Sequence, residues 1–240
     1  MNDKKYIKLP RLYIDIKLSA QANIQLPEAQ SHYLKNVMRK KDGEHIRLFN
    51  AADGEWLAEI TQVSKKAVTT TLQTQLRPPH KDGSELHLIF SPIKKDRLDF
   101  LIEKATEIGA THLHPAIMAN TQLSKIKTDR LEKQIINAAE QCERLDIPVI
   151  SEIRPLREIM QSLPAGLKTF AALERQDNLA SLSGNNNESC AFLAGPEGGF
   201  DDDEMQYLLA HEKVVPVHLG ENILRAETAV CVGLALLHIK

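Results

Sequence analysis

The chain has 240 residues, of which 42% are hydrophobic and 26% charged, so it can bury the core of one large domain or two modest ones. Its apolar runs are shorter than the roughly 20 residues of a membrane span, and its first residues are charged, unlike an export signal. Three cysteines without zinc or redox spacing complete the case for a cytoplasmic protein with no membrane segment.

The net charge of −2 is unevenly spread along the chain. Residues 1–74 carry 12 Lys and Arg against 8 Asp and Glu, whereas residues 75–240 carry 18 against 24. The N-terminal part is therefore the basic part of the protein.

Residues 1–74 are predicted to form a small β-barrel. Alternating or β-branched runs predict strands, and Asp-Gly pairs at 42–43 and 53–54 predict tight turns between some of them. The predicted strands are 12–16, 45–49, 56–63 and 67–72, with one helix at about Pro27–Arg39. Prolines and a glycine without any apolar residue at 77–83 predict a linker, so we divide the chain into a barrel over 1–74, a linker over 75–84 and a second domain over 85–240.

The second domain alternates strands with helices, which is typical of an α/β fold with a largely parallel sheet covered on both faces. The predicted strands are 86–90, 112–117, 169–173, 189–194 and 214–219. The predicted helices are one from Asp96 as N-cap to Gly109, one over 128–142, one that starts at Asp201 with Glu204 at capping-box spacing, and one over 228–239.

Two segments in this domain each follow a predicted strand and precede a predicted helix. The glycines of the loop from Gly195 to Gly199 permit positive φ and let backbone amides approach a ligand, although a tight turn is the alternative. The segment from Leu219 to Ala229 joins apolar side chains to Arg225 and Glu227, for which a salt-bridged helix start is the alternative. Two such loops on one sheet favour a pocket.

A metal site is not expected. His112 and His114 would share one face of a strand, but the sequence shows no matching carboxylate or cysteine cluster beside them. Motifs for phosphate loops, zinc proteases and serine hydrolases are absent from the sequence as well.

The stretch from Ser31 to Lys41 carries four basic residues and one aromatic residue before the first acid. Lys35 and Arg39 are spaced for one helix face, with Leu34, Val37 and Met38 available to bury on another. A solvated face is the alternative, but a basic helix beside a small barrel suits RNA phosphates with some base stacking. The predicted RNA contacts are Arg11, His32, Lys35, Arg39 and Lys40.

These motifs occur in order over nearly the whole chain, and with them the sequence resembles the small-subunit ribosomal RNA uridine-N3 methyltransferases of the RsmE type, in the SPOUT superfamily. The resemblance rests most on Gly195 to Gly199, on Leu219-Gly220 and on Ile223 to Ala229. It implies a PUA-like barrel followed by a SPOUT α/β domain with a mostly parallel sheet, a C-terminal trefoil knot, and a homodimer with cofactor pockets at the subunit interface.

The resemblance also implies which residues would surround S-adenosylmethionine. By position these are Leu173, Gly195, Pro196, Glu197, Gly198, Gly199, Leu219, Gly220, Ile223, Leu224 and Thr228. Arg225 and Glu227 would be the catalytic residues, with Glu227 either orienting Arg225 or accepting a proton. The family often has an arginine where this chain has Asn120-Thr121-Gln122, which puts one RNA contact in doubt.

The activity implied is S-adenosylmethionine-dependent methylation of N3 of a uridine in 16S ribosomal RNA, with the assembled small subunit as the expected partner. N3 would attack the methyl group in an in-line displacement, without a metal or a covalent intermediate. Two alternatives stay open: a ribose 2′-O RNA methyltransferase of the same fold, and a non-catalytic RNA-binding ribosome-assembly factor.

Overall fold

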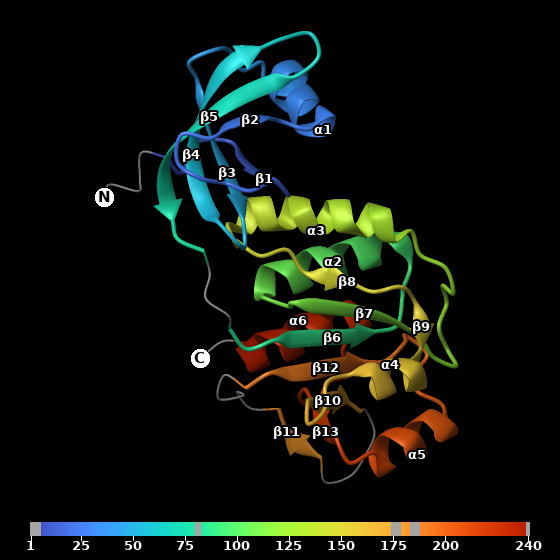
Figure 1. Cartoon of the computed structure of the whole chain (residues 1–240). Coiled ribbons are helices and arrows are strands. Elements are labelled where there is room, and N and C mark those ends of the chain that lie inside the picture. Colours follow the sequence, from blue (N-terminus) through green and yellow to red (C-terminus); the bar gives the residue numbers. More distant parts are fainter. Residues whose placement is uncertain (1–5, 80–82, 174–178, 183–187, 239–240) are drawn as a thin grey trace. The chain divides into compact units, whose positions relative to one another are not determined.

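The computed structural model describes residues 6–79, 83–173, 179–182 and 188–238 (Figure 1). The chain forms two compact units. The first comprises residues 1–82 and 139–147, and the second comprises residues 83–138 and 148–240. Residues 139–147, expected in the second domain, thus belong to the first unit, and residues 80–82 of the expected linker lie outside the described ranges.

The first unit is built on a five-stranded sheet with the order β1-β3-β4-β5-β2. The strands are β1 (Arg11–Tyr13), β2 (Asn23–Gln25), β3 (His45–Asn50), β4 (Gly54–Val63) and β5 (Val68–Arg77). β1 runs parallel to β3 and the other pairs are antiparallel. Residues 75–77, expected in the linker, extend β5, because Arg77 pairs opposite Glu55 of β4. The short strand β2 was not predicted.

The predicted helix 27–39 is shorter and less regular than expected. Helix α1 (Glu28–His32) is followed by a π-helical turn, η2 (Tyr33–Val37), and Arg39 adopts a left-handed conformation with φ of 53°. Leu34 is buried as expected, but Val37 and Met38 are exposed, because the wider turn rotates them away from the core. Lys35 and Arg39 therefore do not share a helix face.

A buried charge cluster corrects the prediction that Arg11 contacts RNA. Glu55 is buried in the first unit, and its carboxylate accepts hydrogen bonds from Arg11 Nε at 3.0 Å, Arg47 Nη1 at 3.0 Å and Arg77 Nε at 2.9 Å. The other guanidinium nitrogens of Arg11 donate to the carbonyls of Ala139 and Arg144 at 2.8 and 2.7 Å. Arg11 is thus a buried structural residue and cannot reach a phosphate.

The second unit contains a sheet with the order β11-β13-β10-β12-β6-β7-β8, with β9 also paired to β7, and every recorded pair is parallel. Its strands are β6 (Leu86–Phe90), β7 (His112–Ile117), β8 (Val149–Ile150), β9 (Arg154–Pro155), β10 (Lys168–Ala172), β11 (Ala180–Ser181), β12 (Cys190–Ala194) and β13 (Val214–His218). The mostly parallel α/β architecture predicted from the sequence is confirmed.

Helices lie on both faces of this sheet (Figure 1). They are α2 (Lys95–Ile108), α3 (Thr128–Cys142), whose residues from 139 onward belong to the first unit, α4 (Leu156–Ser162), α5 (Asp202–Ala210) and α6 (Ala226–His238). Because side chains alternate along a strand, Phe192 of β12 packs against Gly233 of α6, while Leu193 joins an apolar cluster with α4 and α5 on the other face. The short α4, β8, β9 and β11 were not predicted.

Helix ends follow local chemistry. The predicted capping box is present at Asp201 and Glu204, and α2 ends at Gly109 with φ of 107°. The N-cap of α2 is Lys94 rather than Asp96, which lies in the first turn instead. α6 begins at Ala226, two residues before the predicted start, and residue 239 lies outside the described residues. Within the described ranges, no helix has the length and apolar character to cross a membrane.

Candidate active site

Three neighbouring strands of the second sheet bring the predicted cofactor residues to one edge. β12, β10 and β13 are adjacent and parallel, so their carboxyl ends meet there. Leu173 follows β10, Gly195 follows β12 and Leu219 follows β13. The amide of Leu173 donates to Val217 O at 3.1 Å, which ties the first of these segments to the strand that leads into the last.

Each glycine of the loop from Gly195 to Gly199 is required for a different structural reason. A Cβ at Gly195 would lie 2.8 Å from the Phe200 ring, and one at Gly198 would lie 3.0 Å from Asn120 Cβ. Gly199 has a φ of +76° with open space around the Cβ position. The side-chain amide of Asn120, which follows β7, donates from Nδ2 to Gly199 O at 3.0 Å and so holds the glycine loop in place. Sequence reasoning had marked position 120 only as a departure from the family pattern.

Arg97 connects the two predicted loops and was missed by the sequence analysis. It lies in the first turn of α2, donates from Nη1 to the Glu197 carboxylate, and places Nε 3.8 Å from Glu227 Oε1. β6, which leads into α2, pairs in parallel with β12, so the start of α2 lies near the glycine loop. The sequence signal that could have identified Arg97 is a basic residue in the first helical turn after β6.

Glu227 carries an unusual buried oxygen. Its side chain is 12% exposed, and Oε2 has no hydrogen-bond partner among the described residues. A buried carboxylate oxygen without a donor is costly, which marks a place where a ligand can donate a proton or hydrogen bond. Arg225 is exposed, and the contacts within the described ranges include no ion pair between Arg225 and Glu227. The basic neighbour of Glu227 is instead Arg97.

The remaining predicted cofactor residues lie at the same sheet edge and range from buried to exposed. Leu173 and Pro196 are buried, Leu219 and Leu224 are half-buried, and Ile223 is 61% exposed. Gly220 and Thr228 are exposed, and Gly220 has a φ of +119°, which favours glycine. The arrangement offers apolar walls, open space at Gly199 and Gly220, and carboxylates within one short region.

The predicted RNA contacts other than Arg11 remain at the surface of the first unit. His32 and Arg39 are exposed, and Lys35 Nζ donates to Lys65 O at 2.9 Å. Lys40 instead pairs with Glu44 at 2.7 Å. The exposed Tyr33, 40% accessible, stands in the same segment and supplies a ring for base stacking.

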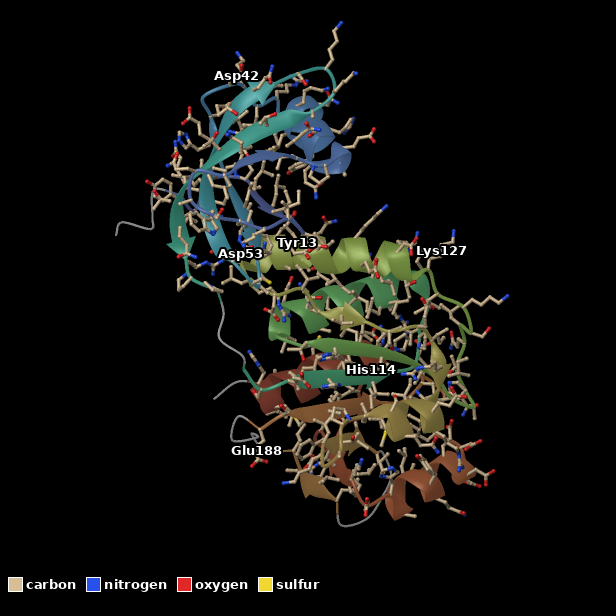
Figure 2. The ribbon with its side chains drawn as sticks, in the orientation of Figure 1. Tyr13, Asp42, Asp53, His114, Lys127 and Glu188 are labelled. Carbon is tan, nitrogen blue, oxygen red and sulfur yellow. The ribbon has the colours of Figure 1, made fainter. Side chains whose placement is uncertain are left out.

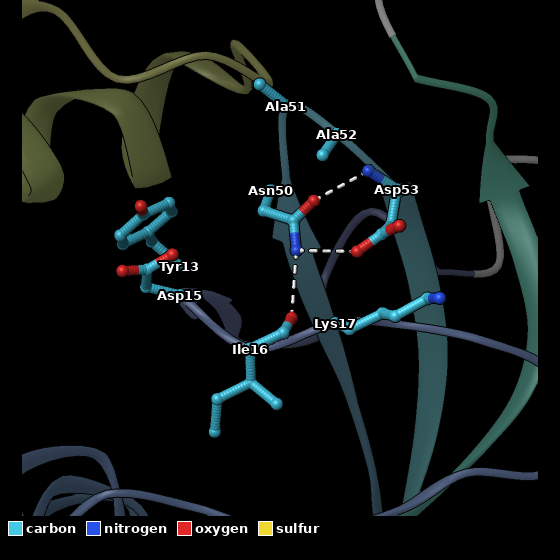
Figure 3. A pocket seen from close by; sticks show the side chains of 8 residues that line it. All are labelled: Tyr13, Asp15, Ile16, Lys17, Asn50, Ala51, Ala52 and Asp53. Atoms are coloured by element: carbon cyan, nitrogen blue, oxygen red, sulfur yellow. Dashed lines mark hydrogen bonds between the residues drawn. The ribbon is translucent and has the colours of Figure 1, made fainter.

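The first unit also holds a pocket of about 470 Å³ (Figure 3). It is lined by Tyr13, Asp15, Ile16, Lys17, Asn50, Ala51, Ala52 and Asp53. Asn50 Nδ2 donates to Ile16 O at 3.0 Å and to Asp53 Oδ2 at 3.2 Å, which holds the walls together. The carboxylates of Asp15 and Asp53 in this pocket would repel a phosphate. The basic segment around Lys35 is therefore the better surface for RNA.

Comparison with known proteins places this geometry in a family. A sequence model of the RNA methyltransferase domain matches residues 80–238, and one of the RNA methyltransferase PUA domain matches residues 26–73. The ribosomal RNA small subunit methyltransferase E of Rickettsia conorii is 34% identical over 95% of both chains. This chain belongs to the small subunit methyltransferase E family. The PUA domain and the family predicted from the sequence are thereby confirmed.

Solved structures agree with membership of the small subunit methyltransferase E family. The family member from Neisseria gonorrhoeae, solved with S-adenosyl methionine bound, has a TM-score of 0.85, 28% identity and 95% coverage of both chains. A Legionella pneumophila methyltransferase solved with the same cofactor has a TM-score of 0.83, 25% identity and coverage of 95% of this chain and 96% of its own. The resemblance thus spans both units.

Proposed function

We infer that this protein transfers the methyl group of S-adenosylmethionine to N3 of a uridine in 16S ribosomal RNA. The observation that carries the inference is the meeting of the Gly195–Gly199 loop and the Leu219–Thr228 segment at one sheet edge, with Arg97 contacting both. Family membership supports the substrate, since the relatives bear the name of small-subunit ribosomal RNA methyltransferases.

The residues at this edge fit S-adenosylmethionine. The buried Leu173 and Pro196 and the half-buried Leu219 offer apolar surface to an adenine ring, and the open space at the Cβ positions of Gly199 and Gly220 lets polar groups of the cofactor come close to the backbone. Glu227 Oε2, which has no hydrogen-bond partner in the described part of the chain, offers negative charge suited to a sulfonium or ammonium group. When bound, the cofactor supplies an electrophilic methyl group.

Two side chains are proposed to act on the uracil. Its N3 loses a proton around the time of attack, and Glu227 Oε2 is the acceptor, because it is buried and has no other donor among the described residues. The exposed Arg225 stabilises the negative charge that develops on the ring oxygens. Arg97 is a positioning residue that holds Glu227 and Glu197 together.

The first unit is proposed to grip the RNA through Lys35, Arg39 and Tyr33, and the assembled small subunit in the cytoplasm is proposed as the substrate. The target base must be unpaired or splayed out, because its N3 edge is hidden in a duplex.

A trefoil knot around α6 and a homodimer complete the proposal. Exposed apolar residues on the packed pair α2 and α6, Phe100 at 45% and Leu236 at 40%, support the dimer.

The assignment is tested by nucleoside mass spectrometry of small-subunit RNA from cells with and without the protein. N3-methyluridine should be lost in its absence and restored by the wild-type chain. Unchanged N3-methyluridine would overturn the inference, and loss of a 2′-O-methylated nucleoside instead would identify the ribose methyltransferase alternative.

The catalytic roles are tested by single-turnover methylation at saturating RNA and cofactor. Glu227→Gln should lower the rate by about 100-fold, as expected for a lost proton acceptor, and Arg225→Lys by about 10-fold through loss of the guanidinium geometry. Glu221→Gln, an exposed residue of the same segment, and Arg130→Lys are the matched controls. Rates near wild type in the Glu227 and Arg225 variants would remove these residues from the mechanism.

A further inference from the structure

Four ligand-type side chains meet at the amino ends of β6 and β7, the ends opposite to those that lead toward the glycine loop. His87 lies in β6, His112 and His114 lie in β7, and Glu85 directly precedes β6. The two parallel strands pair His87 with His112 and Ile89 with His114, so these side chains share one face of the sheet. The His114 side chain, labelled in Figure 2, lies among these strands.

The geometry of three of these residues suits one ion. One ligand atom from each of Glu85, His87 and His112 lies within 4.8 Å of the other two, and Glu85 Oε2 is 3.0 Å from His87 Nε2. Two ligands on a tetrahedral zinc ion stand about 3.4 Å apart, so the side chains must rotate, and the stacked imidazole rings must tilt, to bring all three ligand atoms onto one ion. The rings of His87 and His112 are stacked, with centroids 4.2 Å apart and 11° between their planes.

The surrounding hydrogen bonds leave the required nitrogens available. His112 Nδ1 is 3.0 Å from Thr111 Oγ1, so Nε2 is its ligand nitrogen. His87 Nδ1 is 3.0 Å from His114 Nε2, and His114 Nδ1 is 3.4 Å from Ser151 Oγ. When His87 Nδ1–H donates to His114 and His114 Nδ1–H donates to Ser151, His87 Nε2 carries no proton, and a metal ion can replace its 3.0 Å contact with Glu85 Oε2. Ligating histidines usually have such a second hydrogen bond.

We propose that Glu85, His87 and His112 form a divalent transition-metal site, with zinc as the preferred ion, that joins β6 to β7. Two imidazoles and one carboxylate are a ligand set that zinc accepts, with a fourth position left for water. His87 is buried, whereas the Glu85 side chain is 49% exposed and gives the ion a route of entry. The site stands at the sheet edge away from the glycine loop, so it takes no part in the proposed methyl transfer.

The protonation of the cluster is consistent with this assignment. Burial lowers the pKa of His87, and burial together with His87 and His112 lowers the pKa of His114 to about 4. Neutral imidazole is the form that binds a metal. The sequence shows no carboxylate beside His112 and His114, so a metal site was not expected there. Strand pairing brings Glu85 and His87 to this place from 25 or more positions away in the chain.

The test uses the full chain without a histidine tag, stripped with EDTA and titrated with Co²⁺ as a spectroscopic probe and then with Zn²⁺. The expected result is one equivalent of bound ion, visible cobalt bands of low-symmetry coordination, displacement by zinc, and a higher Tm in the loaded protein. Glu85→Gln and His112→Ala should each weaken zinc binding by at least 10-fold. His114→Phe, which removes the partner of His87, should weaken it by about 10-fold.

Two variants outside the cluster serve as matched controls. Glu103→Gln removes an exposed carboxylate on α2, and His211→Ala removes a half-buried histidine after α5. Both should bind cobalt and zinc as the wild type does. Failure to bind one equivalent of either ion, or equal affinity in wild type, Glu85→Gln and His112→Ala, would overturn the proposal. Methyl transfer is not part of this readout, so its outcome is independent of the proposed function.

Discussion

At the scale of single residues, the candidate active site depends on side chains that come from distant parts of the chain. Asn120 follows β7 and fixes the glycine loop after β12 through Gly199 O. Arg97 contacts Glu197 and approaches Glu227, which lie 100 and 130 positions further along the chain. The conformation of each loop is thus set by a partner that its own local sequence does not contain.

The first prediction concerns Gly198. Valine at this position would drive its side chain against Asn120 Cβ, which is already 3.0 Å from the first added carbon, and would displace the loop. We expect Gly198→Val to weaken S-adenosylmethionine binding by at least 10-fold while RNA affinity stays nearly unchanged, as measured by separate titrations.

A suitable control is Gly166→Ala, which replaces a positive-φ glycine in the turn before β10, where nothing lies within 4 Å of the added carbon. It should cost some stability and leave cofactor affinity intact. Normal cofactor affinity in Gly198→Val would mean that the loop is only a turn.

At the scale of secondary-structure elements, a buried charge cluster joins the strands of the first unit. Glu55 of β4 faces Arg11 of β1, Arg47 of β3 and Arg77 of β5, and Arg47 also pairs with Glu143 at 2.9 Å. Burial alone would raise the pKa of Glu55, but hydrogen bonds and charges from Arg77 and Arg11 outweigh it and hold the pKa below its usual range.

We therefore predict that Glu55→Gln lowers the free energy of unfolding of the first unit by about 3–5 kcal/mol, because the buried guanidinium groups of Arg11 and Arg47 and the half-buried one of Arg77 lose the charge of Glu55. The direction in which the free energy of unfolding changes with pH follows from the lowered pKa of Glu55. The unfolded state takes up the proton first, so the stabilisation is complete above the usual glutamate pKa of about 4.3 and is lost as pH falls below it.

Urea unfolding between pH 3 and 7, followed by Trp56 fluorescence in β4, measures both effects. The wild type should lose stability steeply in acid, and Glu55→Gln should show a shallower slope. Glu59→Gln, on the same strand and bonded only to Gln73 among the recorded contacts, should behave like the wild type. An unchanged acid slope in Glu55→Gln would contradict the proposed role of the cluster.

The irregular helix of the first unit leads to a second prediction at this scale. Lys35 and Arg39 stand at the surface, whereas Lys40 is engaged by Glu44. Alanine at Lys35 and at Arg39 should each lower the slope of log affinity against log salt by about 1, and Lys40→Ala should lower it by less. Filter binding to small-subunit RNA at several salt concentrations measures the slope, with Lys133→Ala on α3 as control. Equal slopes in all variants would assign the helix to a solvated face.

At the scale of the whole molecule, the proposed homodimer depends on exposed apolar residues of the second unit. Phe100 of α2 and Leu236 of α6 belong to two helices that pack on each other. Ile223, 61% exposed, precedes α6 and is one of the predicted cofactor residues. Exposed large side chains on adjoining helices are expected where a second copy covers them.

We predict that Phe100→Asp and Leu236→Asp convert the dimer to a monomer and weaken S-adenosylmethionine binding, because the cofactor pocket is expected at the subunit interface. Sedimentation velocity and cofactor titration measure the two effects. Leu209→Asp on α5 places the same charge at a comparably exposed leucine, 48% accessible, and should leave the dimer intact. A wild type that sediments as a monomer would contradict the dimer itself.

The sequence alone determined the features that follow from local chemistry. Alternating and β-branched runs located the longer strands, Gly109 marked the C-terminal end of α2, and the capping box marked the start of α5. The two loops after β12 and β13 were found because a strand, glycines and a helix follow one another in the chain. Two- and three-residue strands such as β2, β8 and β9 were missed, since their few residues carry no measurable periodicity.

Only the tertiary structure decided which distant residues meet. The burial of Arg11 against Glu55, the contacts of Arg97 with both loops, and the meeting of Glu85 and His87 with His112 all depend on the order and register of strands. The sequence around a basic residue such as Arg11 does not show whether its side chain faces solvent or a buried carboxylate. Strand order is chosen by the burial of whole faces against helices, a property of the folded chain that no short stretch of sequence carries.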